Sequence, residues 1–82
     1  MHRVPRDLSG RELCKLLERC GYIITRQTGS HIRLTAQQLA QEHHITIPNH
    51  DPIKIGTLNK IFHDISETLK ISKEKLIQQL WD

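Results

Sequence analysis

The sequence lacks a long hydrophobic run. None of its uninterrupted apolar segments approaches the roughly 18 residues that a membrane-spanning helix requires. Residues 2–7 also lack the apolar stretch of a secretory signal peptide. We therefore expect a cytoplasmic protein with no membrane partner.

Cysteine is scarce, with Cys14 and Cys20 as its two occurrences. They lie six residues apart on one predicted helix, which separates them by about 9 Å along the axis. A disulfide tolerates at most about 7 Å between Cα atoms, so we expect the two thiols to stay free. We interpret Cys20 as a buried thiol, with Cys14 as the second candidate for burial.

A zinc-binding pattern is absent, although six histidines occur in 82 residues. Adjacent His43 and His44 would point to opposite sides of a strand, and no two histidines share a helix at i, i+4 spacing. We predict neither a metal site nor a cofactor, and we interpret His44 as a strand-surface residue.

The short length predicts one small domain over residues 1–82. Such a chain buries only about 60–65% of its unfolded surface, which leaves little room for a deep pocket. An active site would therefore lie on an exposed face, where a large or flexible polymer fits better than a small metabolite.

The first helix carries clear boundary signals. After an irregular lead-in at residues 1–8, Ser9 and Glu12 have the spacing of a capping box. Leucines at helical spacing follow, and Gly21 is a typical stop. We predict a helix over residues 10–20.

Three short strands are predicted next, over residues 22–27, 31–34 and 44–47. Residues 35–43 are ambiguous, because helix-forming residues follow a candidate cap at Thr35. We expect a hairpin here whose tip is unusual, mobile or briefly helical.

Residues 48–56 are predicted as a loop because proline, asparagine and glycine punctuate them. Thr57 would cap a second long helix, and Ser72 would begin a short helical extension over residues 72–82. This order predicts an α+β fold with a three-stranded antiparallel sheet and both long helices on one face. The apolar cover of the sheet would come from Leu13, Leu17, Ile61 and Ile65.

The most informative motif is Gly29-Ser30-His31, a small-residue turn that leads into a short alternating run. If Ile32 and Leu34 face inward, His31 and Arg33 share the opposite, open face. A titratable imidazole beside a permanent cation is suited to chemistry on a phosphodiester. From spacing alone, however, a lone strand histidine is more often structural than catalytic.

Positive charge gathers in the first part of the chain, where residues 1–33 hold seven Lys/Arg and three Asp/Glu. Within it, Arg11, Lys15 and Arg19 recur every four residues and form a basic stripe on the predicted helix. Such a field favours a polyanion such as RNA. A plain solvated helix face is the competing interpretation.

Three motifs in consistent order resemble the HicA (YcfA-like) toxins, small RNA-cleaving components of bacterial and archaeal toxin–antitoxin pairs. The similarity runs from about Ser9 to Ile65. The motifs are Arg26-Gln27-Thr28-Gly29-Ser30-His31, Ile45-Thr46-Ile47-Pro48-Asn49-His50 and Gly56-Thr57-Leu58. Residues 35–43 depart from the family, whose members often have a shorter hairpin turn there.

The resemblance implies a fold like that of double-stranded-RNA-binding domains, and it places His31 at the catalytic histidine of the family. His50 falls in the Pro-x-His loop, as an auxiliary acid or as a residue that orders the turn; Tyr22 is another candidate for a second acid. For RNA binding we predict the following residues: Arg11, Lys15, Arg19, Arg26, Ser30, Arg33 and Lys60.

The predicted function is therefore that of a toxin of a type II toxin–antitoxin pair: a metal-independent endoribonuclease that cleaves mRNA. Its partners would be RNA and a HicB-like antitoxin that covers the His31 face. The alternatives are a non-catalytic RNA-binding module and a degenerate toxin that acts only as an interaction partner. Lys60 is the single lysine at the predicted start of the second long helix, which counts against tight duplex binding.

Overall fold

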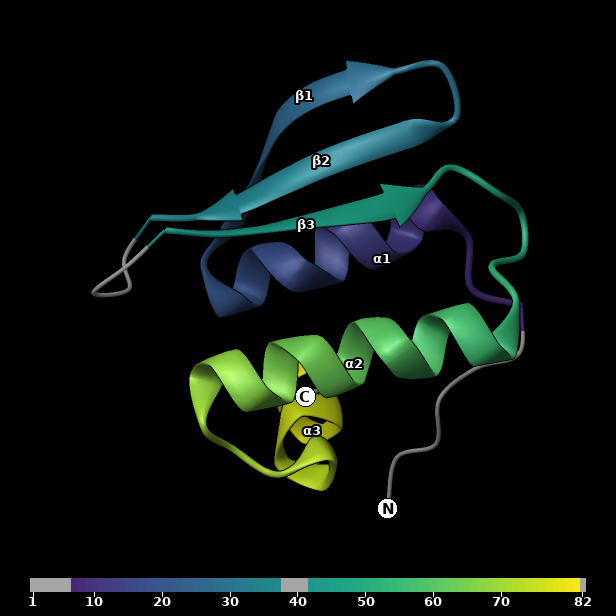
Figure 1. Cartoon of the computed structure of the whole chain (residues 1–82). Coiled ribbons are helices and arrows are strands. Elements are labelled where there is room, and N and C mark those ends of the chain that lie inside the picture. The colour runs from purple at the N-terminus through teal and green to yellow at the C-terminus, as the bar shows by residue number, and fades with distance from the viewer. Residues whose placement is uncertain (1–6, 38–41, 82) are drawn as a thin grey trace.

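A computed structural model describes residues 7–37 and 42–81. The chain forms a three-stranded antiparallel sheet with its helices packed on one side (Figure 1). In chain order, the elements are α1 (Gly10–Leu17), a 3-10 turn η1 (Glu18–Cys20), β1 (Tyr22–Thr28), β2 (His31–Ala36), β3 (His43–Pro48), α2 (Ile55–Leu69) and α3 (Lys73–Trp81). The predicted α+β class and element order are confirmed.

The first helix begins where its capping box predicted. The Ser9 hydroxyl accepts the Glu12 N–H, and the Glu12 carboxylate accepts the Ser9 N–H. Together α1 and η1 span the predicted residues 10–20, and Gly21 ends them with a φ of 88°. Only the last turn differs, because it is 3-10 rather than α.

The cysteines are correctly predicted as unpaired, but the preference for burying Cys20 was wrong. Cys14 is 2% exposed, whereas Cys20 is half-buried. The buried stripe of α1 runs through Gly10, Leu13, Cys14 and Leu17, which are spaced three and four residues apart. Cys20 lies beyond this stripe, in the 3-10 turn.

The sheet has the order β1-β2-β3, and each strand extends beyond its predicted bounds. Gly29 and Ser30 join β1 to β2, with Gly29 at a φ of 55°. A positive φ at the first of two turn residues is the type II′ pattern that glycine favours in hairpins. In β2, Ile32 and Leu34 are buried while His31 and Arg33 are exposed, as the alternation predicted.

The hairpin predicted for residues 35–43 is present, because β2 pairs with β3 from Ala36 and His43 to His31 and Pro48. The helix cap considered at Thr35 was wrong. Thr35 is a buried strand residue opposite His44, so the strand ladder already uses its backbone. The tip at residues 38–41 lies outside the described part of the chain.

The second long helix starts earlier than predicted, at Ile55 rather than after a Thr57 cap. Ile53 is buried, and its N–H donates to the Leu8 carbonyl, which anchors the chain just before the helix. The Lys54 carbonyl then accepts the Leu58 N–H as the first helical hydrogen bond. Tertiary anchoring therefore decides this start rather than side-chain capping.

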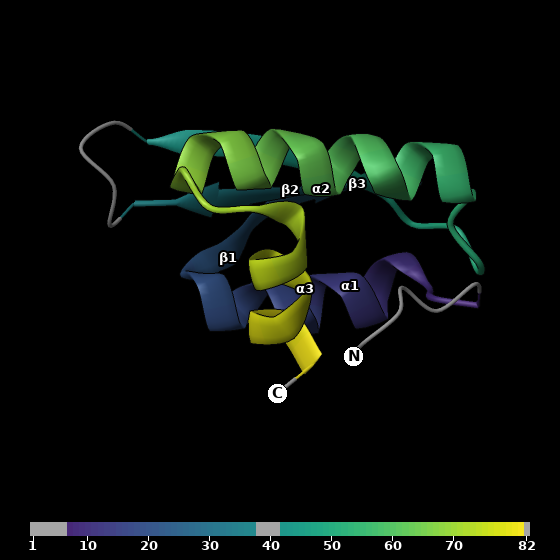
Figure 2. The same ribbon diagram turned by 90° about the horizontal axis from the view of Figure 1, so that it is seen from below.

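The short helix α3 lies across α1 and α2 on the side away from the sheet (Figure 2). Ser72 begins it as predicted, since its hydroxyl accepts the Lys75 N–H. The predicted cover residues Leu13, Leu17, Ile61 and Ile65 are all buried in a core that α3 completes with Leu76 and Leu80. The helices therefore fill one face of the sheet and leave the other face open.

No helix in residues 7–37 and 42–81 has the length and apolar character needed to cross a membrane.

Candidate functional site

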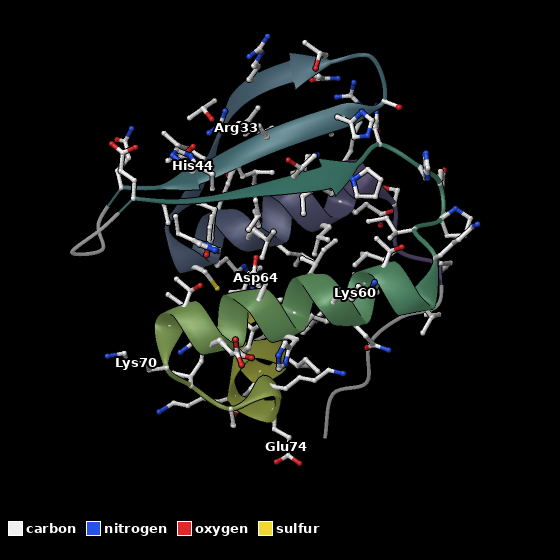
Figure 3. The ribbon with its side chains drawn as sticks, in the orientation of Figure 1. Arg33, His44, Lys60, Asp64, Lys70 and Glu74 are labelled. Carbon is white, nitrogen blue, oxygen red and sulfur yellow. The ribbon has the colours of Figure 1, made fainter. Side chains whose placement is uncertain are left out.

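The open face of the sheet carries the motif that the sequence singled out. On β2, His31, Arg33 and Thr35 point to this face, since the residues between them point into the core. Figure 3 shows Arg33 and His44 on the side of the sheet away from α2. The predicted pairing of His31 with Arg33 on an open face is thus observed.

A β-bulge in β1 adds a second arginine to this face. The register shifts between Ile24 and Arg26, so Thr25 is the extra residue and Arg26 pairs with Arg33. Without the bulge, strict alternation from the buried Tyr22 would turn Arg26 toward the helices. Bulges commonly redirect side chains beside active sites in this way.

These side chains surround a shallow hollow. It is lined by Arg26, Thr28, His31, Arg33 and Thr46, from all three strands. Like charges directly opposite on neighbouring strands destabilise a sheet. Within residues 7–37 and 42–81, neither arginine forms an ion pair with a carboxylate. A bound anion such as a phosphate would relieve this repulsion.

The turn before His31 is held by the residue that follows β3, the neighbour of β2 in the sheet. The Ser30 carbonyl accepts the Asn49 N–H at 2.7 Å, which extends the pairing of β2 and β3 into the turn. The next residue, His50, accepts the Gly10 N–H through its carbonyl at 2.9 Å. The His50 side chain is exposed and does not line the hollow around His31.

The other predicted RNA-binding residues lie elsewhere. Arg11, Lys15 and Arg19 are exposed, but they belong to α1 and η1 in the helix layer. Arg19 also donates from Nη1 to the Leu80 carbonyl at 3.2 Å, which ties η1 to the end of α3. Lys60 is exposed on α2, as Figure 3 shows. The sheet therefore separates these residues from the His31 hollow.

Tyr22 belongs to a hydrogen-bonded group of side chains on the helix side of the sheet. Its hydroxyl lies 2.7 Å from His43 Nδ1, and His43 Nε2 lies 3.5 Å from Asp64 Oδ2. Tyr22 is fully buried, and burial together with the Asp64 charge raises its pKa to about 12. Tyr22 therefore faces away from His31 and is not placed to serve it as an acid.

Sequence reasoning missed a second polar group on the open face. Thr35 Oγ1 lies 2.9 Å from Thr25 Oγ1 and 2.8 Å from His44 Nδ1. His44 Nε2 in turn lies 3.4 Å from Glu42 Oε2. The alternation was a usable signal, because it places Thr35 and His44 on the face of His31, whereas the cross-strand partners depend on the register.

Among the described residues, no three His, Cys, Asp or Glu side chains are grouped as a metal site requires. The geometry instead offers an imidazole and two guanidinium groups on an open strand surface.

The comparisons with known proteins agree with the sequence motifs. No curated protein and no solved structure matches the chain. A family profile described as the HicA toxin of bacterial toxin–antitoxin systems matches residues 10–67, from the start of α1 into the last turns of α2. The match includes the whole sheet and the His31 hollow, and it leaves out α3. It covers well over half of the sequence, so this chain belongs to the HicA toxin family, whose members act with a cognate antitoxin.

Proposed function

We propose that this chain is a metal-independent endoribonuclease that cleaves mRNA, with His31 as its catalytic residue. The observation that carries the proposal is the hollow in which His31 lies with Arg26 and Arg33. All three side chains are exposed on the face that the helices leave open. A flexible single strand can reach such a surface without the molecule having to open.

The chemistry follows from the groups in the hollow. RNA cleavage by its own 2′-hydroxyl requires removal of the 2′ proton and protonation of the departing 5′-oxygen. An imidazole, with an ordinary pKa near 6.5, can serve either step at neutral pH, and such catalysis typically contributes 10²–10⁴-fold. Arg26 and Arg33 would stabilise the charge that develops on the phosphate. The products are a 2′,3′-cyclic phosphate and a 5′-hydroxyl.

We propose that the antitoxin is a HicB-like protein that covers the His31 face. The chain would meet both this antitoxin and mRNA in the cytoplasm. The exposed Ile23 supports this assignment of the antitoxin surface, because it pairs with Thr35 and therefore lies on the open face. An apolar side chain that is 50% exposed on the same face as two arginines suits a protein partner that buries it. RNA and the antitoxin would then compete for the same face, so the bound antitoxin would block cleavage.

The central test compares His31→Ala with His63→Ala, an exposed histidine on α2 that pairs with Glu67. Expression of the chain alone should arrest bacterial growth and degrade mRNA, and His31→Ala should abolish both. His63→Ala should retain both, and the small protein encoded next to this one should restore growth. Circular dichroism checks that each variant is folded.

Product analysis tests the proposed chemistry. Cleavage should persist in EDTA and leave 2′,3′-cyclic or 3′-phosphate ends. A folded His31→Ala variant that cleaves at the wild-type rate would contradict the role of His31. Dependence on added Mg²⁺, or 3′-hydroxyl ends, would contradict the mechanism. RNA binding without cleavage would favour the binding-module alternative, and binding of the antitoxin alone would favour a degenerate toxin.

A further inference from the structure

A second hollow adjoins the one around His31 on the open face. It shares Arg26 and Arg33 with the first, and it continues toward the opposite end of β2. Its remaining lining residues are Thr25, Thr35, Gln37, Glu42 and His44. The two arginines therefore form a ridge with a histidine on either side.

The spacing of the hollows suits a polymer. Thr35, which holds His44, lies four residues after His31 on β2, or about 13 Å at roughly 3.3 Å per residue. This separation exceeds one phosphate group, and the ridge of Arg26 and Arg33 lies between. A strand whose phosphate rests on the ridge would place nucleotides in both hollows.

The imidazole of His44 is held in one orientation. Its Nδ1 lies 2.8 Å from Thr35 Oγ1, which lies 2.9 Å from Thr25 Oγ1, and its Nε2 lies 3.4 Å from Glu42 Oε2. Thr35 is only 2% exposed, so the hydroxyl that fixes the ring is itself fixed by the sheet.

This orientation assigns a role to the ring. Nδ1 of His44 is hydrogen-bonded to Thr35, and Nε2 lies beside the Glu42 carboxylate, so both edges of the ring are next to protein side chains. Its side chain nevertheless remains 40% exposed. A flat ring whose edges lie against other side chains can still present its face to a ligand. Unstacked RNA bases bind to such faces on aromatic and histidine side chains.

Other stacking rings are not available on this surface. The three larger aromatic residues are Tyr22, Phe62 and Trp81, and all belong to the helix side of the sheet. Tyr22 and Phe62 are fully buried, and Trp81 packs edge-on against Phe62. An RNA base on the open face can therefore stack only on an imidazole or a guanidinium plane.

We propose that the hollow at His44 is a second nucleotide-binding site, in which the imidazole stacks on a base beyond the two nucleotides that the cleaved phosphate joins. The site deepens the proposed ribonuclease function and rests on it. His44 binds the substrate rather than reacting with it, and Thr35 is a positioning residue that acts through His44. Substrate length and sequence preference would be set here, while bond cleavage remains at His31.

The first experiment measures binding, independently of cleavage. In a His31→Ala background, a fluorescein-labelled single-stranded RNA decamer of random sequence is titrated by fluorescence anisotropy. Adding His44→Ala should weaken binding by about 5- to 30-fold, the scale of losing one stacked base. Adding His44→Phe should restore most of the affinity, because phenylalanine keeps a ring but no nitrogen. Adding His63→Ala, the matched histidine control, should leave the affinity unchanged.

The second experiment measures cleavage with His31 intact. His44→Ala and Thr35→Val should raise KM for the decamer with little change in kcat, and they should not affect a dinucleotide substrate that fills only the His31 hollow. Equal affinity with and without His44 would overturn the second site, as would equal losses on both substrates or a failure of His44→Phe to rescue. If the wild-type chain binds the decamer through His44 but never cuts it, the ribonuclease proposal fails while the nucleotide site stands.

Discussion

At the scale of single residues, two buried groups make the stability of the fold sensitive to alkaline pH. Burial raises the pKa of the Cys14 thiol from 9.0 to about 11, and that of the Tyr22 hydroxyl from 10.0 to about 12. Both groups lose their protons more readily in the unfolded chain, so rising pH favours unfolding. Stability should be undiminished by them below about pH 9 and should fall progressively through about pH 12.

Urea unfolding midpoints across this range would check the prediction. Cys14→Ala should reduce the part of the decline that starts near the unfolded thiol pKa, and the remainder belongs to Cys20, whose pKa burial also raises. Tyr22→Phe should remove the later part and should also cost about 1 kcal/mol at neutral pH, because it deletes the hydrogen bond to His43. Identical pH profiles for the wild type and both variants would contradict this account.

The same scale shows what a sequence can reveal about a site. The alternation of β2 predicted that His31 and Arg33 share the open face. Side chains along a strand point to its two faces in turn, so burial of Ile32 and Leu34 leaves the residues beside them on the other face. It also predicted opposite directions for His43 and His44, and the structure confirms them. The bulge at Thr25 has no such local signal, since it depends on how β1 aligns with β2. The strand alternation therefore does not predict that Arg26 lies in the hollow.

At the scale of elements, Gly10 couples the start of α1 to the end of β3. A Cβ at Gly10 would collide with the Pro48 carbonyl oxygen, whereas a Cβ at Gly56 in α2 would meet nothing within 4 Å. Gly10→Ala should destabilise the protein by about 1–3 kcal/mol, as overpacking does, despite the better helix propensity of alanine. Gly56→Ala should instead stabilise it by up to about 1 kcal/mol. Thermal unfolding of the two variants gives the comparison, and stabilisation by both would rule out the steric coupling.

Element boundaries show the limits of local rules. Ser9 and Ser72 predicted helix starts correctly, because each hydroxyl accepts a backbone N–H three residues later. Thr57 failed as a cap because the buried Ile53, hydrogen-bonded to Leu8, already directs the chain into α2 at Ile55. That anchor joins two segments far apart in sequence, so no local pattern contains it. The order of elements was predictable, while the exact start of α2 required the packed core.

At the scale of the whole molecule, the cations that the sequence predicted to bind RNA lie on opposite sides of the sheet. Arg26 and Arg33 flank His31 on the open face, whereas the basic stripe of Arg11, Lys15 and Arg19 lies in the helix layer. A short single strand on the open face would contact the first group and not the second. The salt dependence of RNA binding can separate their contributions, because each neutralised phosphate contributes a slope of about −0.7 in log affinity against log salt for single strands.

We therefore expect the double change of Arg26 and Arg33 to Gln to flatten this slope by up to ~1.4, from two phosphate contacts. The triple change of Arg11, Lys15 and Arg19 to Gln should leave the slope near its wild-type value. Glutamine is nearly as good a helix former as arginine or lysine, so α1 should survive the triple change. Arg19→Gln also removes the hydrogen bond to the Leu80 carbonyl, so thermal unfolding must accompany the titrations. If the triple change flattens the slope by up to ~2 instead, the stripe holds phosphates as the sequence predicted, and the RNA must extend around the edge of the sheet.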